Sequence, residues 1–234
     1  DYVLTVSDLA RESYVAAGVS KKKVLSIPVG CDLSQFKPEV RKIEANIEKE
    51  IFSFIFVGHA RELKGIDLLI KVSKKLLKNE LEHKILFVGN IDGSLKGKIK
   101  DLKSSDMLGY KQGSKLADIY SNSDCLILPS RFDSFGMVVV EAMASGTPVI
   151  VSNQTGAKEA VTEGESGWVI SIEDEKELAE RMEWCIRNRK KVRAMRKKAR
   201  KDAEKFSWEK YHKRIQIFYG RLLENKPITQ EMLT

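Results

Sequence analysis

Two carboxylates stand out in the stretch SRFDSFGMVVVEAMASGTPVIVS (residues 130–152): Asp133 and, eight residues later, Glu141. Glu141 interrupts an otherwise apolar helical run, and a buried carboxylate without a partner is costly. A rise of 1.5 Å per residue separates the two acids by roughly 10 Å, whereas the acid pairs of glycoside hydrolases lie about 5–9.5 Å apart. The spacing therefore suits the two ends of a long polyhydroxylated ligand such as a nucleotide sugar. A buried ion pair between Glu141 and a Lys or Arg is an equally good interpretation.

The loop before this helix has the composition of an anion site. Asp133 or Ser134 can cap a helix that starts near Phe135, and Gly136 has no side chain to keep a ligand away. The free N–H groups at the start of a helix, here those of Phe135, Gly136 and Met137, favour an anion such as a diphosphate. An ordinary capped helix is the commoner explanation of such a loop taken alone.

A second loop, GHARELKG (residues 58–65), supplies cations after an apolar strand. Arg61 and Lys64 would suit a diphosphate leaving group, although surface Arg and Lys residues are common. Neither a G-x-G-x-x-G motif nor a GxxxxGK[ST] loop is present, so the sequence does not support a dinucleotide cofactor or a nucleoside-triphosphate loop.

Alternating apolar runs and helical segments must position these loops. The runs at 52–58, 84–89, 124–130, 147–152 and 167–171 predict buried strands, with helices expected between them, including one at 156–162. This order predicts an α/β fold with a doubly wound, Rossmann-like parallel sheet covered on both faces. Because ligands of such sheets bind beyond the carboxyl ends of the strands, the loops after the first three runs are expected to converge on one crevice.

Composition narrows the class of protein. The chain has 234 residues, 42% of them hydrophobic, and no apolar run long enough to span a membrane. Cys31, Cys125 and Cys185 match no zinc spacing and form no cluster with the histidines, so we expect reduced thiols, a cytoplasmic location and no structural metal. The chain begins without Met inside an apparent strand, which indicates a piece of a longer protein.

The net charge of +8 is concentrated in RNRKKVRAMRKKARK (residues 187–201). Such a run could bind nucleic acid or anionic lipid. It could also be a solvated helix face, because Val192, Met195 and Ala199 form a narrow apolar seam that would pack on the body of the protein. No aromatic residue is interleaved with the bases, which favours the solvated helix, with loose attraction to a membrane surface as the reserve.

The segment PSRFDSFGMVVVEAMASGTPVIVSNQTGAKEAV, followed by EGESGWVI, resembles the signature of the retaining GT-B glycosyltransferases of the glycosyl transferases group 1 family: two acids separated by seven residues and then a G-x-P-V strand. FVGHARELKGIDLLI resembles the phosphate-binding loop of that family. The opening TVSDLARESYVAAGVSKKKVLSIPVGCDLSQFKP and the closing FSWEKYHKRIQIFYGRLL resemble its interdomain segments. The resemblance covers nearly the whole chain.

The resemblance implies a role for each matching position. Glu141 would bind the ribose hydroxyls, Asp133 the hydroxyls of the donor sugar, and Lys64 the diphosphate. His59 stands where the family usually has Arg, and Arg61 would take over that work. Tyr110 is a candidate neighbour of the base, although packing in the core is its commoner role. The catalytic set is therefore Arg61, Lys64 and Asp133, and the donor-binding set is Glu141, Ser134, Phe135, Gly136, Met137, Gly58, His59 and Tyr110.

The resemblance also implies an organisation: residues 1–30 as the end of an amino-terminal acceptor domain, 31–50 as a linker, 51–205 as the nucleotide-sugar-binding domain, and 206–234 as a closing helix that packs back toward the amino-terminal domain. This would be the carboxy-terminal half of a GT-B fold, with little turnover alone.

The reaction expected from the resemblance is the transfer of a hexose, with retention and without a metal or other cofactor, to a glycan or lipid-linked acceptor in polysaccharide biosynthesis. UDP-sugar is the first candidate donor and GDP-sugar the second. The expected location is the cytoplasm, with peripheral contact at the inner face of the membrane as a further expectation. The competing hypothesis is a non-catalytic module that binds nucleic acid or anionic lipid through its basic surface.

Overall fold

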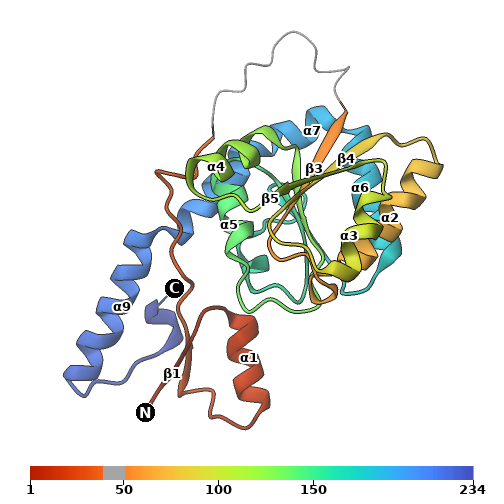
Figure 1. The fold of residues 1–234 in the computed structure, drawn as a ribbon. Helices are drawn as coiled ribbons and strands as arrows, with labels where there is room; N and C mark the ends of the chain where they lie inside the picture. The colour runs from red at the N-terminus through yellow and green to blue at the C-terminus, as the bar shows by residue number, and fades with distance from the viewer. Residues whose placement is uncertain (39–50, 234) are drawn as a thin grey trace.

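The computed structural model describes residues 1–38 and 51–233 of the chain. Within these residues, six parallel strands form one sheet in the order β5-β4-β3-β6-β7-β8, with helices on both faces (Figure 1). The predicted doubly wound parallel sheet is therefore confirmed. Of the expected linker at 31–50, residues 39–50 lie outside the described part. The strands of this sheet are β3 (Phe52–Val57), β4 (His83–Val88), β5 (Ser105–Gly109), β6 (Cys125–Leu128), β7 (Val149–Ser152) and β8 (Gly167–Ile170).

The helices sort into two layers. Helix α2 packs with α3 and α6, whereas α5 packs with α4 and α8 (Figure 1). The central strands β3, β6 and β7 are largely apolar and almost fully buried, as expected for a sheet covered on both faces, whereas the edge strand β5 is partly exposed. These helices are α2 (Ile66–Lys78), α3 (Gly93–Lys100), α4 (Gly113–Asn122), α5 (Met137–Ala144), α6 (Glu175–Arg187), α7 (Arg189–Ala194) and α8 (Arg196–Ala203), with 3-10 turns η1 (Glu62–Lys64), η2 (Gly156–Ala160) and η3 (Glu204–Phe206). The helix expected at 156–162 is thus the shorter 3-10 turn η2.

A second, smaller unit joins the two ends of the chain. Leu25 and Ile27 share an apolar cluster with Phe218, Ile228 and Leu233. Figure 1 shows α1, β1 and α9 beside the sheet rather than on it. The elements of this unit are β1 (Val3–Thr5), α1 (Asp8–Ala16), β2 (Val24–Ser26), α9 (Trp208–Leu223) and the turn η4 (Gln230–Leu233), with β1 and β2 paired in parallel.

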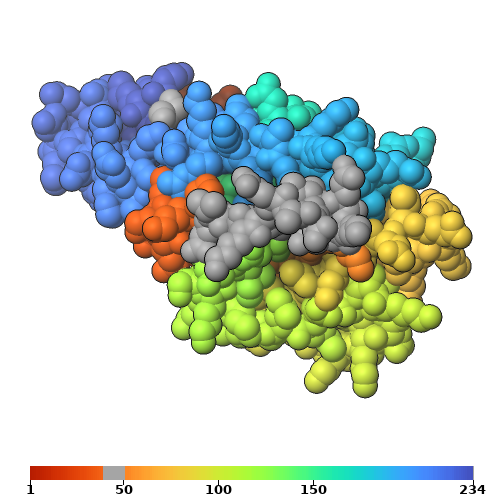
Figure 2. Space-filling view, turned by 90° about the horizontal axis from the view of Figure 1, so that it is seen from above, coloured from red at the N-terminus to blue at the C-terminus, as the bar shows by residue number. Residues whose placement is uncertain are grey.

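Several arginines of the basic run at 187–201 bind groups of the protein itself. Arg200 donates to the carbonyls of Phe36 (2.7 Å) and Ala144 (2.9 Å), and Arg196 donates to the carbonyl of Ser121 (2.9 Å). Arg189 binds Asp124, a carboxylate with no solvent exposure, at 2.8 Å. The predicted apolar seam of Val192, Met195 and Ala199 is buried. Figure 2 shows the blue helices of this region running along one side of the molecule. The described helices include none that is long and apolar enough to cross a bilayer.

Replacing Arg200 by Ala is expected to lower the free energy of unfolding by about 2–4 kcal/mol, because three carbonyls in partly buried hydrogen bonds would lose a charged donor at once. Those carbonyls belong to Leu33, Phe36 and Ala144. Urea denaturation measures the change. The matched control is Lys197→Ala on the exposed face of α8, which should change the free energy by no more than about 0.5 kcal/mol. Equal effects of the two substitutions would contradict the assignment.

Candidate functional site

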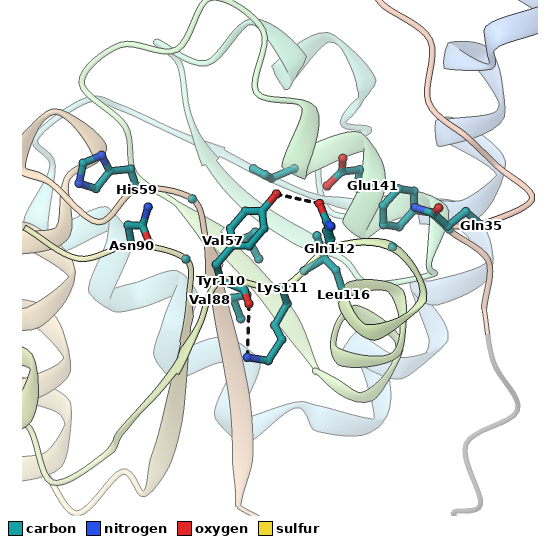
Figure 3. Close-up of a pocket in the computed structure, with 15 residues that line it drawn as sticks. Gln35, Val57, His59, Val88, Asn90, Tyr110, Lys111, Gln112, Leu116 and Glu141 are labelled. Carbon is teal, nitrogen blue, oxygen red and sulfur yellow. Dashed lines mark hydrogen bonds between the residues drawn. The ribbon is translucent and has the colours of Figure 1, made fainter.

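A pocket of about 720 Å³ opens where the carboxyl ends of three strands meet (Figure 3). This volume is in the range of small-molecule sites. The pocket lies where the strand order turns, because β3 is flanked by β4, which follows it, and by β6. Such a switch point is where open α/β sheets bind ligands. The lining residues are Val57, Gly58 and His59 at the end of β3; Val88, Gly89 and Asn90 at the end of β4; Tyr110, Lys111 and Gln112 after β5; Gly113 and Leu116 of α4; Val138 and Glu141 of α5; and Gln35 and Phe36.

Glu141 lines this pocket and has a neutral partner. The hydroxyl of Tyr120, a fully buried residue of α4, donates to Glu141 Oε2 at 3.0 Å. Burial raises the pKa of the Glu141 carboxyl, and the Tyr120 hydrogen bond opposes that rise. Among the described residues no Lys or Arg pairs with Glu141, so the ion pair that the sequence left open does not form there.

The helix that carries Glu141 begins later than expected. Its first residue is Met137, and Gly136 precedes it in the left-handed conformation with φ of 89°, without a side-chain cap. The expected start near Phe135 with Asp133 or Ser134 as cap was therefore wrong. The Asp133 carboxylate binds Lys64 instead of capping the helix. The left-handed Gly136 leads directly into the helix, which begins at Met137. Within the described part of the chain, the N–H groups of Phe135, Gly136 and Met137 have no acceptor.

Lys64 and Asp133 form an ion pair with Nζ and Oδ2 2.6 Å apart, joining the two loops that the sequence singled out. Neither residue lines the pocket. Of the predicted site residues, the pocket brings together Gly58, His59, Tyr110 and Glu141. Arg61 is exposed at the start of η1, and the pocket lining does not include Arg61, Ser134, Phe135, Gly136 or Met137.

Tyr110 is exposed rather than packed in the core. Its side chain is 65% exposed, and its hydroxyl donates to Gln112 Oε1 at 3.0 Å. Packing in the core, the commoner role weighed from the sequence, is therefore wrong. Figure 3 shows Tyr110 and Gln112 in the middle of the pocket, with His59 and Asn90 on one side and Gln35 on the other.

Two partners of site residues were missed in the sequence. Asp92 Oδ1 lies 2.6 Å from His59 Nε2, and Tyr120 holds Glu141. Asp92 follows β4 in the loop GNIDG, so the convergence of the strand ends was the signal that could have found it. Tyr120 lies in the middle of a helix and gives no such signal.

The loop with Asp133 is attached on its other side to the start of α1. The Ser7 hydroxyl donates to the Ser134 carbonyl at 2.5 Å, and the Asp8 N–H donates to Glu159 Oε1 at 2.6 Å. Gly156 lies between these groups and has no room for a side chain against Ser7 and Ser134. The pKa of Glu159 is raised to about 7: burial is the main cause and the Asp8 carboxylate adds to it, whereas the Asp8 and Leu9 N–H groups and Lys158 oppose the rise.

Comparisons with known proteins agree with the fold. Residues 36–202 match the family model "Glycosyl transferases group 1". D-inositol 3-phosphate glycosyltransferase 1 of Catenulispora acidiphila is 29% identical over 224 residues, covering 88% of this chain and 54% of that protein. Sulfoquinovosyl transferase SQD2 of Arabidopsis thaliana is 29% identical over 220 residues, covering 89% of this chain and 42% of that protein. The chain spans about half the length of the curated relatives it matches.

Solved structures give the same result. Sucrose-phosphate synthase from Thermosynechococcus elongatus superimposes with a TM-score of 0.80 at 25% identity, covering 97% of this chain and 59% of that chain. HepE of Anabaena, in complex with UDP and glucose, has a TM-score of 0.78 at 20% identity over 94% of this chain and 63% of that chain. At that identity the likeness to HepE concerns the fold alone.

The Glu159 contact predicts a pH-dependent stability. Between about pH 4.5 and 7 the folded protein keeps a proton that the unfolded chain has lost, so the Glu159 contribution to stability falls as the pH rises through this window. Glu159→Gln removes the titration and keeps an acceptor for the Asp8 N–H. The melting temperature of the variant relative to that of the wild type should therefore rise by about 2–4 °C between pH 5 and pH 8, or about 1 kcal/mol once solvent screening is discounted. A difference that stays constant with pH would contradict this assignment.

Proposed function

The chain belongs to the glycosyl transferases group 1 family, and from this premise we propose that it is the donor-binding half of a retaining GT-B glycosyltransferase. The proposed reaction transfers a hexose from a nucleotide-diphosphate sugar to a glycan or lipid-linked acceptor. Residues 51–205 form the donor domain in this proposal, and residues 1–30 and 206–234 connect it to an acceptor domain. The two curated relatives carry different names for the group or acceptor involved, so only the class of reaction is proposed.

The observation that carries the proposal is the Glu141 carboxylate, which lines the pocket without a neutralising cation from residues 1–38 or 51–233. Helix α5 keeps this acid among apolar neighbours despite the cost of burial. A carboxylate accepts two hydroxyl hydrogen bonds at once, so the vicinal diol of a ribose would satisfy it without a counter-charge. Tyr110, exposed in the same pocket, offers an aromatic face to the base.

Lys64 and the start of α5 are proposed to hold the diphosphate. The N–H groups of Phe135, Gly136 and Met137, which have no acceptor among the described residues, stand at the positive end of that helix, and Lys64 is bound to Asp133 of the preceding loop. As the bond between the anomeric carbon and the diphosphate oxygen breaks, negative charge grows on the leaving oxygen. Donors already fixed in place would stabilise that charge without reorganisation. Asp133 would accept hydrogen bonds from sugar hydroxyls, and Arg61 would reach the diphosphate from the opposite loop.

UDP-sugar is the first candidate donor and GDP-sugar the second. The proposed location of the enzyme is the cytoplasm, with peripheral contact at the inner face of the membrane. The competing function, a basic module for nucleic acid or lipid, loses support because Arg189, Arg196 and Arg200 bind groups of the protein itself. The exposed Lys side chains of the run remain on the surface as a solvated face.

Calorimetric titration with UDP, GDP and ADP tests the proposal. One nucleoside diphosphate is expected to bind the wild-type chain, and Glu141→Gln should weaken that binding by at least about tenfold, because a charged acceptor of the ribose hydroxyls is lost. Glu82→Gln is the matched control. Glu82 is exposed just before the amino end of β4, whereas the pocket lies at the carboxyl ends of the strands, so this substitution should leave the affinity unchanged.

The full-length protein should be titrated in parallel. If neither form binds any of the three diphosphates, or if both variants bind like the wild type, Glu141 is a structural residue and the proposed function is wrong. Salt-sensitive binding of a polyanion that falls when the Arg187–Lys201 charges are removed, with no dependence on Glu141, would support the competing function instead.

A further inference from the structure

The ion pair between Lys64 and Asp133 is largely shielded from solvent. Nζ and Oδ2 lie 2.6 Å apart, and the two side chains are only 18% and 16% exposed. A charge-assisted hydrogen bond in such surroundings is stronger than a pair on the open surface, because less water screens it. The protein therefore holds these two groups together before any donor is present.

The loop on the Lys64 side is fixed by Arg131. The Arg131 N–H donates to the Leu63 carbonyl at 2.9 Å, and its guanidinium binds both carboxylate oxygens of Asp67 at 2.8 Å. The same guanidinium also binds the Glu62 carbonyl and the Glu173 carboxylate. Because Glu62 and Leu63 directly precede Lys64, these bonds fix the backbone that carries Lys64.

The loop on the Asp133 side is fixed by the segment after β7. The Asp133 N–H donates to the Gln154 carbonyl at 2.9 Å, and the Asp133 carbonyl accepts from the Gly156 N–H at 3.0 Å. Neither loop can withdraw without breaking these bonds. A ligand group that approaches Lys64 must therefore also approach the Asp133 carboxylate.

The role inferred below for this ion pair rests on the proposed function, in which Lys64 binds the diphosphate. In a nucleotide sugar, the terminal phosphate is esterified to the sugar and carries one negative charge. In the free nucleoside diphosphate, the same phosphate has a second ionisation with a pKa near 6, so most of it carries two charges at pH 7. The sugar also brings hydroxyl donors for the carboxylate, which the free diphosphate lacks.

We propose that Asp133 is a specificity-determining residue that makes the site favour the nucleotide sugar over the free nucleoside diphosphate. It does so by sharing the charge of Lys64 and by repelling the second charge of an unesterified terminal phosphate. The same repulsion promotes release of the diphosphate product after transfer.

Equilibrium titrations of the full-length protein with UDP and UDP-glucose test this proposal, or with GDP and GDP-mannose if guanine is the base bound. Asp133→Asn should bind the free diphosphate about tenfold more tightly at pH 7.5, from the removal of one charge a few ångströms away. It should bind the sugar nucleotide no better than the wild type. Asp133→Glu retains the charge and should keep the wild-type ratio of the two affinities.

Asp67→Asn is the matched control for loosened loops, because it removes a carboxylate that holds Arg131 but meets no proposed ligand group. It should leave the ratio of the two affinities unchanged. The pH provides a readout that a structural role would not move. Between pH 5.5 and 7.5 the gain of Asp133→Asn for the free diphosphate should grow as the terminal phosphate ionises, whereas its effect on the sugar nucleotide should stay flat. Asp133→Ser serves the same test if Asp133→Asn does not fold.

An equal loss of both ligands in Asp133→Asn, or a gain that does not change with pH, would overturn the proposal and leave Asp133 as a clamp between loops. Failure of the wild type to bind either ligand would instead overturn the proposed function on which this inference rests. The two failures are therefore distinguishable in one set of titrations.

Discussion

Helix α5 is a short, nearly wholly apolar helix buried against the sheet, and burial requires that the polar groups at its ends find partners. At its carboxyl end the Ala144 carbonyl accepts from Arg200 of α8. At its amino end the described structure offers no acceptor for the first N–H groups. One end of the helix is thus satisfied by the protein, whereas the N–H groups at the other end would be satisfied by an anion under the proposed function. Helices α4 and α8 both pack against α5.

The placement of the arginines explains how a basic chain keeps carboxylates at its site. The formal charge of +8 suggests an excess of cations everywhere, yet Arg189 is bound by a buried carboxylate, and Arg196 and Arg200 are bound by backbone carbonyls. Glu141, partly buried in the pocket, has the Tyr120 hydroxyl as its one hydrogen-bond partner in the described part of the chain. Cations near the site are limited in the described residues to those on the loops, and one of them, Lys64, is already shared with Asp133. These arginines are therefore used in packing, whereas the Glu141 carboxylate lines the pocket.

The sheet and the convergence of the strand ends could be predicted from the sequence because both follow from local patterns: continuous apolar runs specify buried parallel strands, and the parallel topology brings their carboxyl ends together. Glu141 could be singled out because a carboxylate in an apolar helix is conspicuous. The Lys64–Asp133 pair and the Tyr120–Glu141 bond could not, since each depends on how loops or helices distant in the sequence pack. The late start of α5 was missed for a related reason: a left-handed Gly136 and a side chain drawn away by Lys64 override the usual capping pattern.

The contact between α1 and the loop at Asp133 links the small unit to the site. Ser7 binds the carbonyl of Ser134, the residue next to Asp133, and Glu159 binds the first N–H of α1. Gly156 packs against both Ser7 and Ser134, so the three segments fit together with little free space. A tight contact transmits displacement, because packed groups move together or separate abruptly rather than deform. Any rotation of α1 relative to the sheet would therefore displace the loop that carries Asp133. In an enzyme with a second domain attached through residues 1–30, a movement of that domain would therefore shift the loop that carries Asp133.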